Sequence, residues 1–169
     1  MHGAIGHDVM EGTTDALSRI SKFLAQHGTT EYLATTVTAS MDFRLHALDG
    51  IARHIERKPA GDEATLRGVH LEGPFLSHVK RGMHPPQFIL PPSVEVLNRL
   101  WQAARGHIMM MTIAPENPGA LETIARANEL GIRCSIGHSN ADTAEALDAL
   151  KAGAISATHT YNAMRLLEC

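Results

Sequence analysis

Residues 69–74 read Val-His-Leu-Glu-Gly-Pro, an apolar strand-like run that ends in a carboxylate and is then interrupted by glycine and proline. Successive side chains of a strand point to opposite faces, so His70 and Glu72 share one face and the two aliphatic side chains share the other. A carboxylate at a strand end could ligate a metal or transfer a proton. The alternative is a buried hydrogen bond between the histidine and the glutamate, or a surface strand end, and this segment taken alone favours that alternative.

Short apolar runs alternate with amphipathic helical stretches on both sides of this strand. We expect strands at 32–38, 66–72, 108–114, 132–136 and 154–159, and helices at 14–26, 42–57, 93–104, 118–130 and 143–151. Asn117 is expected to cap the fourth helix, with Pro118 at its first position and Gly131 after its end. The alternation predicts βαβ units and a parallel sheet.

Four polar side chains stand at the carboxyl ends of the predicted strands, namely Glu72, Glu116, His138 and His159. Open doubly wound sheets and (β/α)8 barrels both place active sites at this end of their strands. A site assembled from many strand ends suits the barrel better than the open sheet. The loop at 73–92, which holds five prolines, is a further candidate for a functional segment.

The composition is that of an ordinary globular chain. Its 169 residues carry 15 Lys and Arg against 18 Asp and Glu, a formal charge of −3, so no nucleic-acid or membrane partner is expected. The longest apolar run, at 108–114, is far shorter than the roughly 20 residues that cross a bilayer, and no targeting segment is visible. Cys134 and Cys169 are too few for a disulfide scaffold, and a cytoplasmic protein with reduced thiols is expected.

Histidine is abundant, with 11 residues in the chain. Each histidine taken alone is more often a hydrogen-bonded core residue, and Ser139 or Asn140 could explain one polar cluster by capping the helix that follows. Glu72, His138 and His159 on neighbouring strands change this balance, because a His/His/Glu set can bind a catalytic zinc ion and leave a fourth position open for water. No G-x-S-x-G elbow, P-loop or G-x-G-x-x-G motif competes with this interpretation.

Five motifs occur in the order found in one enzyme family. They are His-Leu-Glu-Gly-Pro-Phe at 70–75, Gly-Met-His-Pro-Pro at 82–86, Thr-Ile-Ala-Pro-Glu at 112–116, Gly-His-Ser-Asn-Ala at 137–141 and Thr-His-Thr-Tyr-Asn-Ala-Met at 158–164. Together they resemble the N-acetylglucosamine-6-phosphate deacetylases of the amidohydrolase superfamily. Residues 1–8 resemble the tail of the family's D-x-H-x-H-G opening, with His2 as the second histidine and the first one lost.

The resemblance implies an incomplete fold. A closed (β/α)8 barrel takes about 250 residues, and this chain corresponds to roughly strands two to six with the end of strand one. We therefore expect an α/β fold, an incomplete (β/α)8 TIM barrel, in which residues 1–169 form one partial metal-dependent amidohydrolase domain. The two open edges of such a sheet favour a homo-oligomer or another form of self-association.

The resemblance also implies a metal site. Glu72, His138 and His159 fall where the family binds its divalent metal ion, and we expect one ion per chain, zinc or iron. His2 falls where members with a second metal place one of its ligands. Because the first histidine of that opening is missing, the second site lacks a partner ligand.

The implied substrate is a small amino-sugar phosphate. Met83 and His84 match the loop that contacts the substrate, although the family more often has a small residue in place of Met83. Asn162 and Ala163 match the next substrate-binding pair. The implied reaction is hydrolysis of the acetamide of N-acetylglucosamine 6-phosphate by a metal-activated water, with glucosamine 6-phosphate and acetate as products.

No catalytic residue is assigned in this chain. The family's general base is an aspartate at the end of the eighth strand, beyond the last residue, and nothing places Asp8, Glu116 or Asp142 against the reacting water. One alternative is therefore a truncated, non-catalytic remnant that keeps the metal ligands. Another is an amidohydrolase for a cyclic amide or an aminopurine, whose expected signature is a lysine metal bridge or four histidines with an aspartate.

Overall fold

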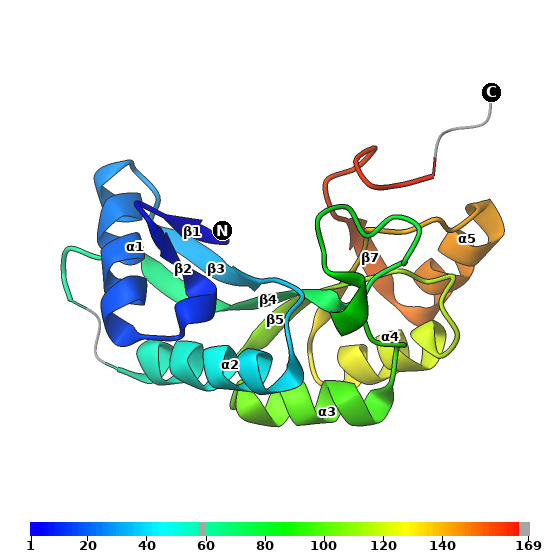
Figure 1. The fold of residues 1–169 in the computed structure, drawn as a ribbon, viewed down its shortest axis with the longest axis horizontal. Helices are drawn as coiled ribbons and strands as arrows, with labels where there is room; N and C mark the ends of the chain where they lie inside the picture. Colours follow the sequence, from blue (N-terminus) through cyan, green and yellow to red (C-terminus); the bar gives the residue numbers. More distant parts are fainter. Residues whose placement is uncertain (58–59, 166–169) are drawn as a thin grey trace.

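Five parallel strands form one sheet in the order β3-β4-β5-β6-β7, so each strand pairs with its neighbour along the chain. The structure, a computed structural model, describes residues 1–57 and 60–165 (Figure 1). The strands are β3 (Glu31–Thr36), β4 (Thr65–Phe75), β5 (Ile108–Ile113), β6 (Arg133–Ile136) and β7 (Ala154–Ala157). The expected α/β architecture with a five-stranded parallel sheet is confirmed.

Helices cover the outer side of the sheet and follow one another in chain order. They are α1 (Thr14–Gln26), α2 (Met41–Glu56), α3 (Val94–Ala103), α4 (Ala120–Glu129) and α5 (Thr143–Ala152), with short 3-10 helices at η1 (Val9–Glu11) and η2 (Pro86–Phe88). Each α-helix packs against the next. Figure 1 shows α2 and α3 along the lower edge, with α1 at the left end and α4 and α5 at the right. None of the helices in the described part of the chain combines the length and apolarity needed to cross a bilayer.

The core lies between the sheet and these helices. Its fully buried members include large side chains from both layers, among them Leu17, Ile20, Leu48, Ile51, Leu71, Phe75, Leu97, Leu100, Ile108, Met111, Ile113 and Ile124. Burial of each such side chain contributes roughly 1.5–3 kcal/mol. Cys134 of β6 is also fully buried, and burial raises the pKa of its thiol to about 12, so it packs as a small apolar group. Cys169 lies outside the described residues.

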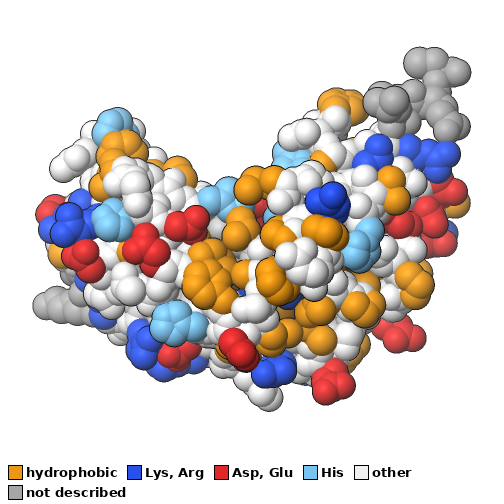
Figure 2. Space-filling view, viewed as in Figure 1, with side chains coloured by type: hydrophobic (Ala, Val, Ile, Leu, Met, Phe, Trp, Pro, Cys, Tyr) orange, Lys and Arg blue, Asp and Glu red, His pale blue; other side chains and the backbone are white. Residues whose placement is uncertain are grey.

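The opposite face of the sheet is polar. His70 of β4 lies between the hydroxyl oxygens of Thr35, at 3.3 Å from its Nδ1, and Thr112, at 2.8 Å from its Nε2. The Thr112 hydroxyl is 2.8 Å from that of Thr158, which donates to Ser135 Oγ at 2.8 Å. One hydrogen-bonded row thus connects all five strands. Figure 2 shows the molecule hollowed between two raised ends above this sheet.

The amino-terminal residues lie beside β3. The Met1 nitrogen donates to Leu33 O at 3.2 Å, and Thr35 N donates to Met1 O at 2.9 Å, which is the pattern of a parallel ladder. This pairing agrees with the expected end of a preceding strand. The chain then forms an antiparallel hairpin, β1 (Gly3–Ala4) and β2 (His7–Asp8), before it enters η1.

The expected Asn117 cap is wrong, and the alternative capping role of Ser139 or Asn140 is also not observed. α4 begins at Ala120 after Gly119 in the left-handed region, at φ 85°, whereas the Asn117 amide donates to Leu76 O at 3.0 Å. Asn117 is therefore used to attach a distant loop. α5 is capped by Asp142, whose carboxylate accepts from Glu145 N at 2.9 Å, so neither Ser139 nor Asn140 caps it.

The β4 strand is longer than expected. β4 continues through Gly73, at φ 129°, to Phe75 with a register shift against β5 after Leu71.

The edge of the sheet at β7 is apolar. Leu147 and Leu150 of α5 and Ile155 of β7 are at least half exposed. These side chains lie where a further βα unit would pack in a larger barrel.

Gly50 allows α2 to pass directly over the turn that follows η1. A Cβ atom at this position would lie 1.8 Å from Gly12 O and 2.6 Å from Gly12 C, both of which are backbone atoms. Backbone cannot yield as a flexible side chain can. The close contact therefore requires glycine in the middle of a helix, where glycine is otherwise unfavourable.

We predict that Gly50→Ala destabilises the protein despite the roughly 1 kcal/mol that alanine gains in helix propensity. Overpacking against backbone is expected to outweigh that gain, by about 1–3 kcal/mol, and to lower the melting temperature by roughly 3–10 °C. Gly61→Ala is the matched control, because no atom lies within 4 Å of its added Cβ. Thermal unfolding followed by circular dichroism checks both variants. Equal melting temperatures for the two would contradict the close contact.

Candidate metal centre

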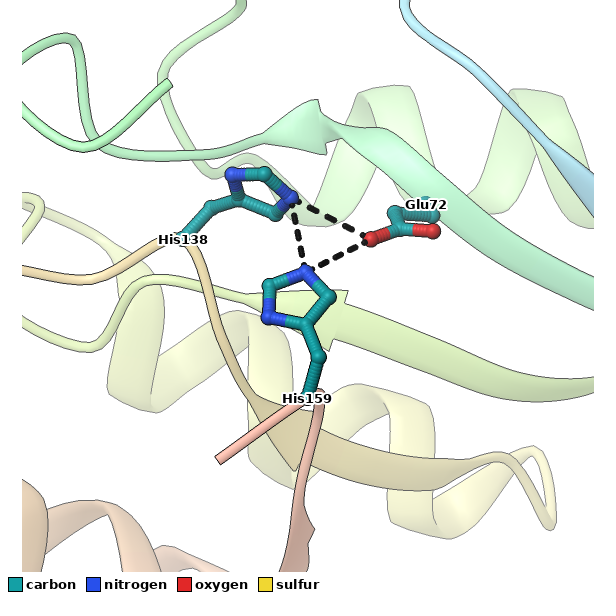
Figure 3. Close-up of side chains that lie close together, drawn as sticks. All are labelled: Glu72, His138 and His159. Atoms are coloured by element: carbon teal, nitrogen blue, oxygen red, sulfur yellow. Dashed lines mark hydrogen bonds and ion pairs between the residues drawn. The ribbon is translucent and has the colours of Figure 1, made fainter. Parts of the chain in front are cut away.

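Three strand ends bring Glu72, His138 and His159 together. Glu72 lies in β4, and each histidine follows the end of its strand, β6 or β7, by two residues. The carboxyl ends of parallel strands lie at one edge of the sheet, so side chains distant in sequence meet there. One ligand atom from each residue lies within 4.8 Å of the others, and the three side chains point toward one another (Figure 3).

The short distances involve one carboxylate oxygen and two ring nitrogens. Glu72 Oε1 lies 3.3 Å from His138 Nε2 and 3.4 Å from His159 Nε2, and the two nitrogens are 3.0 Å apart. Glu72 and His138 are buried, whereas His159 is about one-third exposed. The cluster is therefore covered on one side and open on the other.

Backbone carbonyls orient both rings. His138 Nδ1 lies 2.9 Å from Lys80 O, and His159 Nδ1 lies 3.0 Å from Asn162 O. A carbonyl oxygen only accepts hydrogen bonds, so each Nδ1 carries a proton and donates it. In the neutral rings both Nε2 lone pairs then face each other and the Glu72 carboxylate. Such a group of electron-rich atoms is stabilised by a cation at its centre.

The pKa values of the cluster show the same preference for positive charge. Burial alone would raise the pKa of Glu72, but hydrogen bonds from His138 and His2 hold it well below its usual range. Burial alone would lower the pKa of His138, but its bonds to Glu72 and to the Lys80 carbonyl raise it. The carboxylate thus stays ionised, and the neighbouring ring binds a proton more tightly than a free histidine does.

Both histidines have a strained backbone. The φ angles are 48° at His138 and 33° at His159, in the left-handed region that residues with a side chain rarely adopt. Such a conformation costs of order 1–3 kcal/mol and persists only where surrounding contacts determine it. Strained residues cluster at functional sites, which agrees with a role for this pair.

His2 contacts the other oxygen of the same carboxylate. Its Nε2 lies 3.4 Å from Glu72 Oε2, and its Nδ1 lies 3.0 Å from Thr35 O. The hydrogen bond to Glu72 raises the pKa of His2. With about half of its side chain exposed, His2 stands beside the three-residue cluster and outside its short ligand distances.

A cavity of about 570 Å³ opens onto the cluster. The residues that line it come from the amino terminus, the loop after β4 and the loops after β6 and β7: His2, Asp8, Val37, Glu72, Gly82, Met83, His84, His138, His159, Asn162 and Ala163. All eight residues proposed from the sequence as metal ligands or substrate contacts lie around this one space. Val37 and Gly82 were missed, since an aliphatic residue and a glycine carry no signal of their own.

His84 is held as a neutral ring at the cavity wall. Its Nδ1 lies 2.7 Å from Thr38 Oγ1 and accepts from Thr38 N at 3.4 Å, so one residue holds the ring through its hydroxyl and its backbone. Burial, assisted by the charge of His138, lowers the pKa of His84 to about 4. Met83 beside it is 86% exposed at the rim. Thr38 has no motif around it, and its role was not expected from the sequence.

A buried arginine of α2 also holds the loop that carries His84. Arg44 of α2 is buried and donates from Nη2 to Phe88 O in η2. Burial lowers the pKa of this guanidinium to about 10, so it remains charged near neutral pH. The expected functional loop at 73–92 is therefore anchored at Phe88, while Val79 and Met83 of the same loop are exposed.

No protein-family model matches the sequence, but curated proteins match nearly all of it. N-acetylglucosamine-6-phosphate deacetylase of Bacillus subtilis (strain 168) is 40% identical over 168 residues, which are 97% of this chain and 42% of that protein. N-acetylgalactosamine-6-phosphate deacetylase of Escherichia coli O157:H7 is 33% identical over 97% of this chain and 43% of that protein. The chain thus spans less than half the length of these relatives.

A solved structure reproduces the fold. The N-acetyl-D-glucosamine-6-phosphate deacetylase of Mycobacterium smegmatis, as an aspartate-to-alanine mutant in complex with N-acetyl-D-glucosamine-6-phosphate, is 35% identical and superimposes with a TM-score of 0.92. The match covers 99% of this chain and 42% of that chain. The five-stranded arc is therefore a part of a TIM barrel, and the chain is homologous to the N-acetylglucosamine-6-phosphate deacetylases of the amidohydrolase family.

Proposed function

We propose that this chain is the metal-binding and partly substrate-binding portion of a deacetylase that hydrolyses N-acetylglucosamine 6-phosphate to glucosamine 6-phosphate and acetate. The observation that carries the proposal is the convergence of Glu72 Oε1, His138 Nε2 and His159 Nε2 at the wall of one cavity. The homology supports the reaction class. The relatives are more than twice as long as this chain, so the complete activity is part of the proposal.

The three convergent residues fit a divalent ion, with zinc or iron as the candidates. They offer two neutral imidazole nitrogens and an ionised carboxylate, a donor set that suits a catalytic zinc site with an open position. When bound, such an ion polarises an amide carbonyl and lowers the pKa of a water molecule toward neutrality. The carbonyls of Lys80 and Asn162 keep both rings in the tautomer that presents a lone pair.

The remaining cavity residues would bind and orient the sugar. His84 keeps its Nε2 available because Nδ1 is bonded to Thr38 and the ring is uncharged. Asn162 offers a side-chain amide and Ala163 a backbone group next to His159. Met83 forms an apolar rim. These groups recognise a polar, uncharged ring, and the acetamide would lie toward Glu72 and the two histidine ligands.

A non-catalytic metal-binding chain is the second candidate function. Among the described residues, Asp8 is the one acid besides Glu72 that lines the cavity, and its carboxylate accepts from Met10 N at 2.8 Å as the cap of η1. Glu116 and Asp142 accept backbone hydrogen bonds elsewhere. None of these three is assigned as the general base.

We also propose self-association through the edge formed by α5 and β7, where Leu147, Leu150 and Ile155 are exposed.

A cytoplasmic location is proposed as well, in keeping with the free thiol of Cys134 and the phosphorylated substrate.

The catalytic proposal requires that the purified chain supplied with zinc release acetate from N-acetylglucosamine 6-phosphate above the rate for buffer and zinc alone. N-acetylgalactosamine 6-phosphate is the comparison substrate, because one relative is named as the deacetylase of that sugar phosphate. An enzyme-coupled acetate assay measures both rates. A chain that binds one zinc ion and releases no acetate from either sugar would support the non-catalytic alternative.

Glu72→Ala is expected to reduce bound zinc from one equivalent to none, because it removes the only anionic group of the cluster. Metal content after dialysis, measured by atomic emission, checks this. Glu129→Ala is the control, since that carboxylate is exposed and pairs with Arg126 on the surface. Full zinc content in the Glu72→Ala variant would refute the proposed site.

Zinc affinity is expected to fall as the pH decreases from 8 to 6. The pKa of His138 lies above that of a free histidine, so below this raised value a proton occupies the ring and zinc must displace it. The loss should approach about tenfold per pH unit for each proton displaced. Competition with a chelator at several pH values measures it. An affinity that stays constant over this range would contradict the raised pKa.

A further inference from the structure

Glu116 lies three residues after the end of β5 and does not line the cavity. Its two carboxylate oxygens accept hydrogen bonds from two consecutive residues: Oε2 from Ser139 Oγ at 2.8 Å and Oε1 from Asn140 N at 2.6 Å. Both donors follow His138 directly in the chain. One side chain from the neighbouring strand thus holds the segment that begins with a candidate metal ligand.

Ser139 connects this segment to the loop after β7. Its backbone N donates to Ala163 O at 3.1 Å, and its carbonyl accepts from Arg165 N at 3.2 Å, so the residue forms a parallel bridge with Met164. Its hydroxyl also accepts from Ala141 N at 3.0 Å. Ser139, which Glu116 holds, is therefore hydrogen-bonded through both its N–H and its carbonyl to the segment that carries Asn162 and Ala163.

The geometry of His138 requires such contacts. At φ 48° its backbone is strained, and without fixed neighbours it would relax toward negative φ. The bond from Nδ1 to Lys80 O orients the ring, and Ser77 N donates to His138 O at 2.9 Å. These two contacts hold the residue itself. The peptides that follow it are held by the Glu116 carboxylate.

We propose that Glu116 is a positioning residue for the metal centre and for the substrate-binding segment, acting through Ser139 and Asn140. This inference rests on the proposed function, because it assigns a role relative to the metal ligand His138. Glu116 touches neither that ligand's ring nor the cavity. It fixes the backbone from which His138 projects and, through the bridge at Ser139, the backbone at 163–165.

The test compares Glu116→Ala, Glu116→Gln and Ser139→Ala with the unmodified chain. Glu116→Ala removes both acceptors, Glu116→Gln keeps one acceptor oxygen, and Ser139→Ala removes one donor. Glu129→Ala is the matched acidic control from the neighbouring α4. Zinc dissociation constants come from chelator competition at one pH, and the visible absorption spectrum of the cobalt form reports the ligand geometry. The melting temperature of each metal-free variant measures the stability of the fold separately.

We expect Glu116→Ala to weaken zinc binding about 10- to 100-fold and to change the cobalt spectrum. Glu116→Gln should recover a part of this loss, and the double variant Glu116→Ala/Ser139→Ala should bind zinc no more weakly than Glu116→Ala alone. Glu129→Ala should match the unmodified chain in both measurements.

Three outcomes overturn the inference. Unchanged zinc affinity and an unchanged cobalt spectrum in folded Glu116→Gln and Ser139→Ala would show that the contacts do not position His138. If zinc affinity decreases only in proportion to the fraction of unfolded protein in each variant, Glu116 has a purely structural role. If the unmodified chain binds no zinc, the proposed function itself fails. That result can be distinguished from a failure of the Glu116 inference alone, because it does not depend on any Glu116 variant.

Discussion

Parallel pairing of the five strands is the constraint on which the site depends. In a parallel sheet every strand ends at the same edge, so residues separated by more than 60 positions, such as Glu72 and His138, become neighbours. Helices between the strands fill the outer face with apolar side chains. The inner face is therefore free for the polar row from Thr35 to Ser135 and for the cluster above it.

Local periodicity was sufficient to predict the five α-helices and the five strands of the parallel sheet, whereas the short β1–β2 hairpin and the two 3-10 helices were not predicted. Long-range contacts explain the errors at the element ends. α1 lies at 14–26 as expected, because its apolar spacing and its Thr13 cap are properties of the segment itself. The start of α4 was wrong because Asn117 bonds to Leu76, a residue 41 positions away. β4 extends past Gly73 for a similar reason: pairing with β5 resumes at Phe75.

The candidate site was predictable as a set of residues, and its internal chemistry was not. The motifs identify Glu72, His138 and His159, because each was expected at the end of a strand and lies within three residues of one. The tautomer of each ring depends on the carbonyls of Lys80 and Asn162, and no side-chain pattern marks a backbone oxygen. Glu116 had a recognisable position, but the hydrogen bonds that give it a role appear only when the loops after β5 and β6 are placed together.

The imidazole rings of His84, His138 and His159 form a continuous row. Successive centroids are 4.7 and 4.6 Å apart, and the rings meet edge to face at 85° and 86°. Burial and, to a smaller extent, the charge of His138 lower the pKa of His84 and so disfavour its protonation. Charge on His138 thus influences His84 through a direct ring contact, without movement of the chain. A ligand that contacts His84 in the cavity therefore meets an uncharged hydrogen-bonding surface.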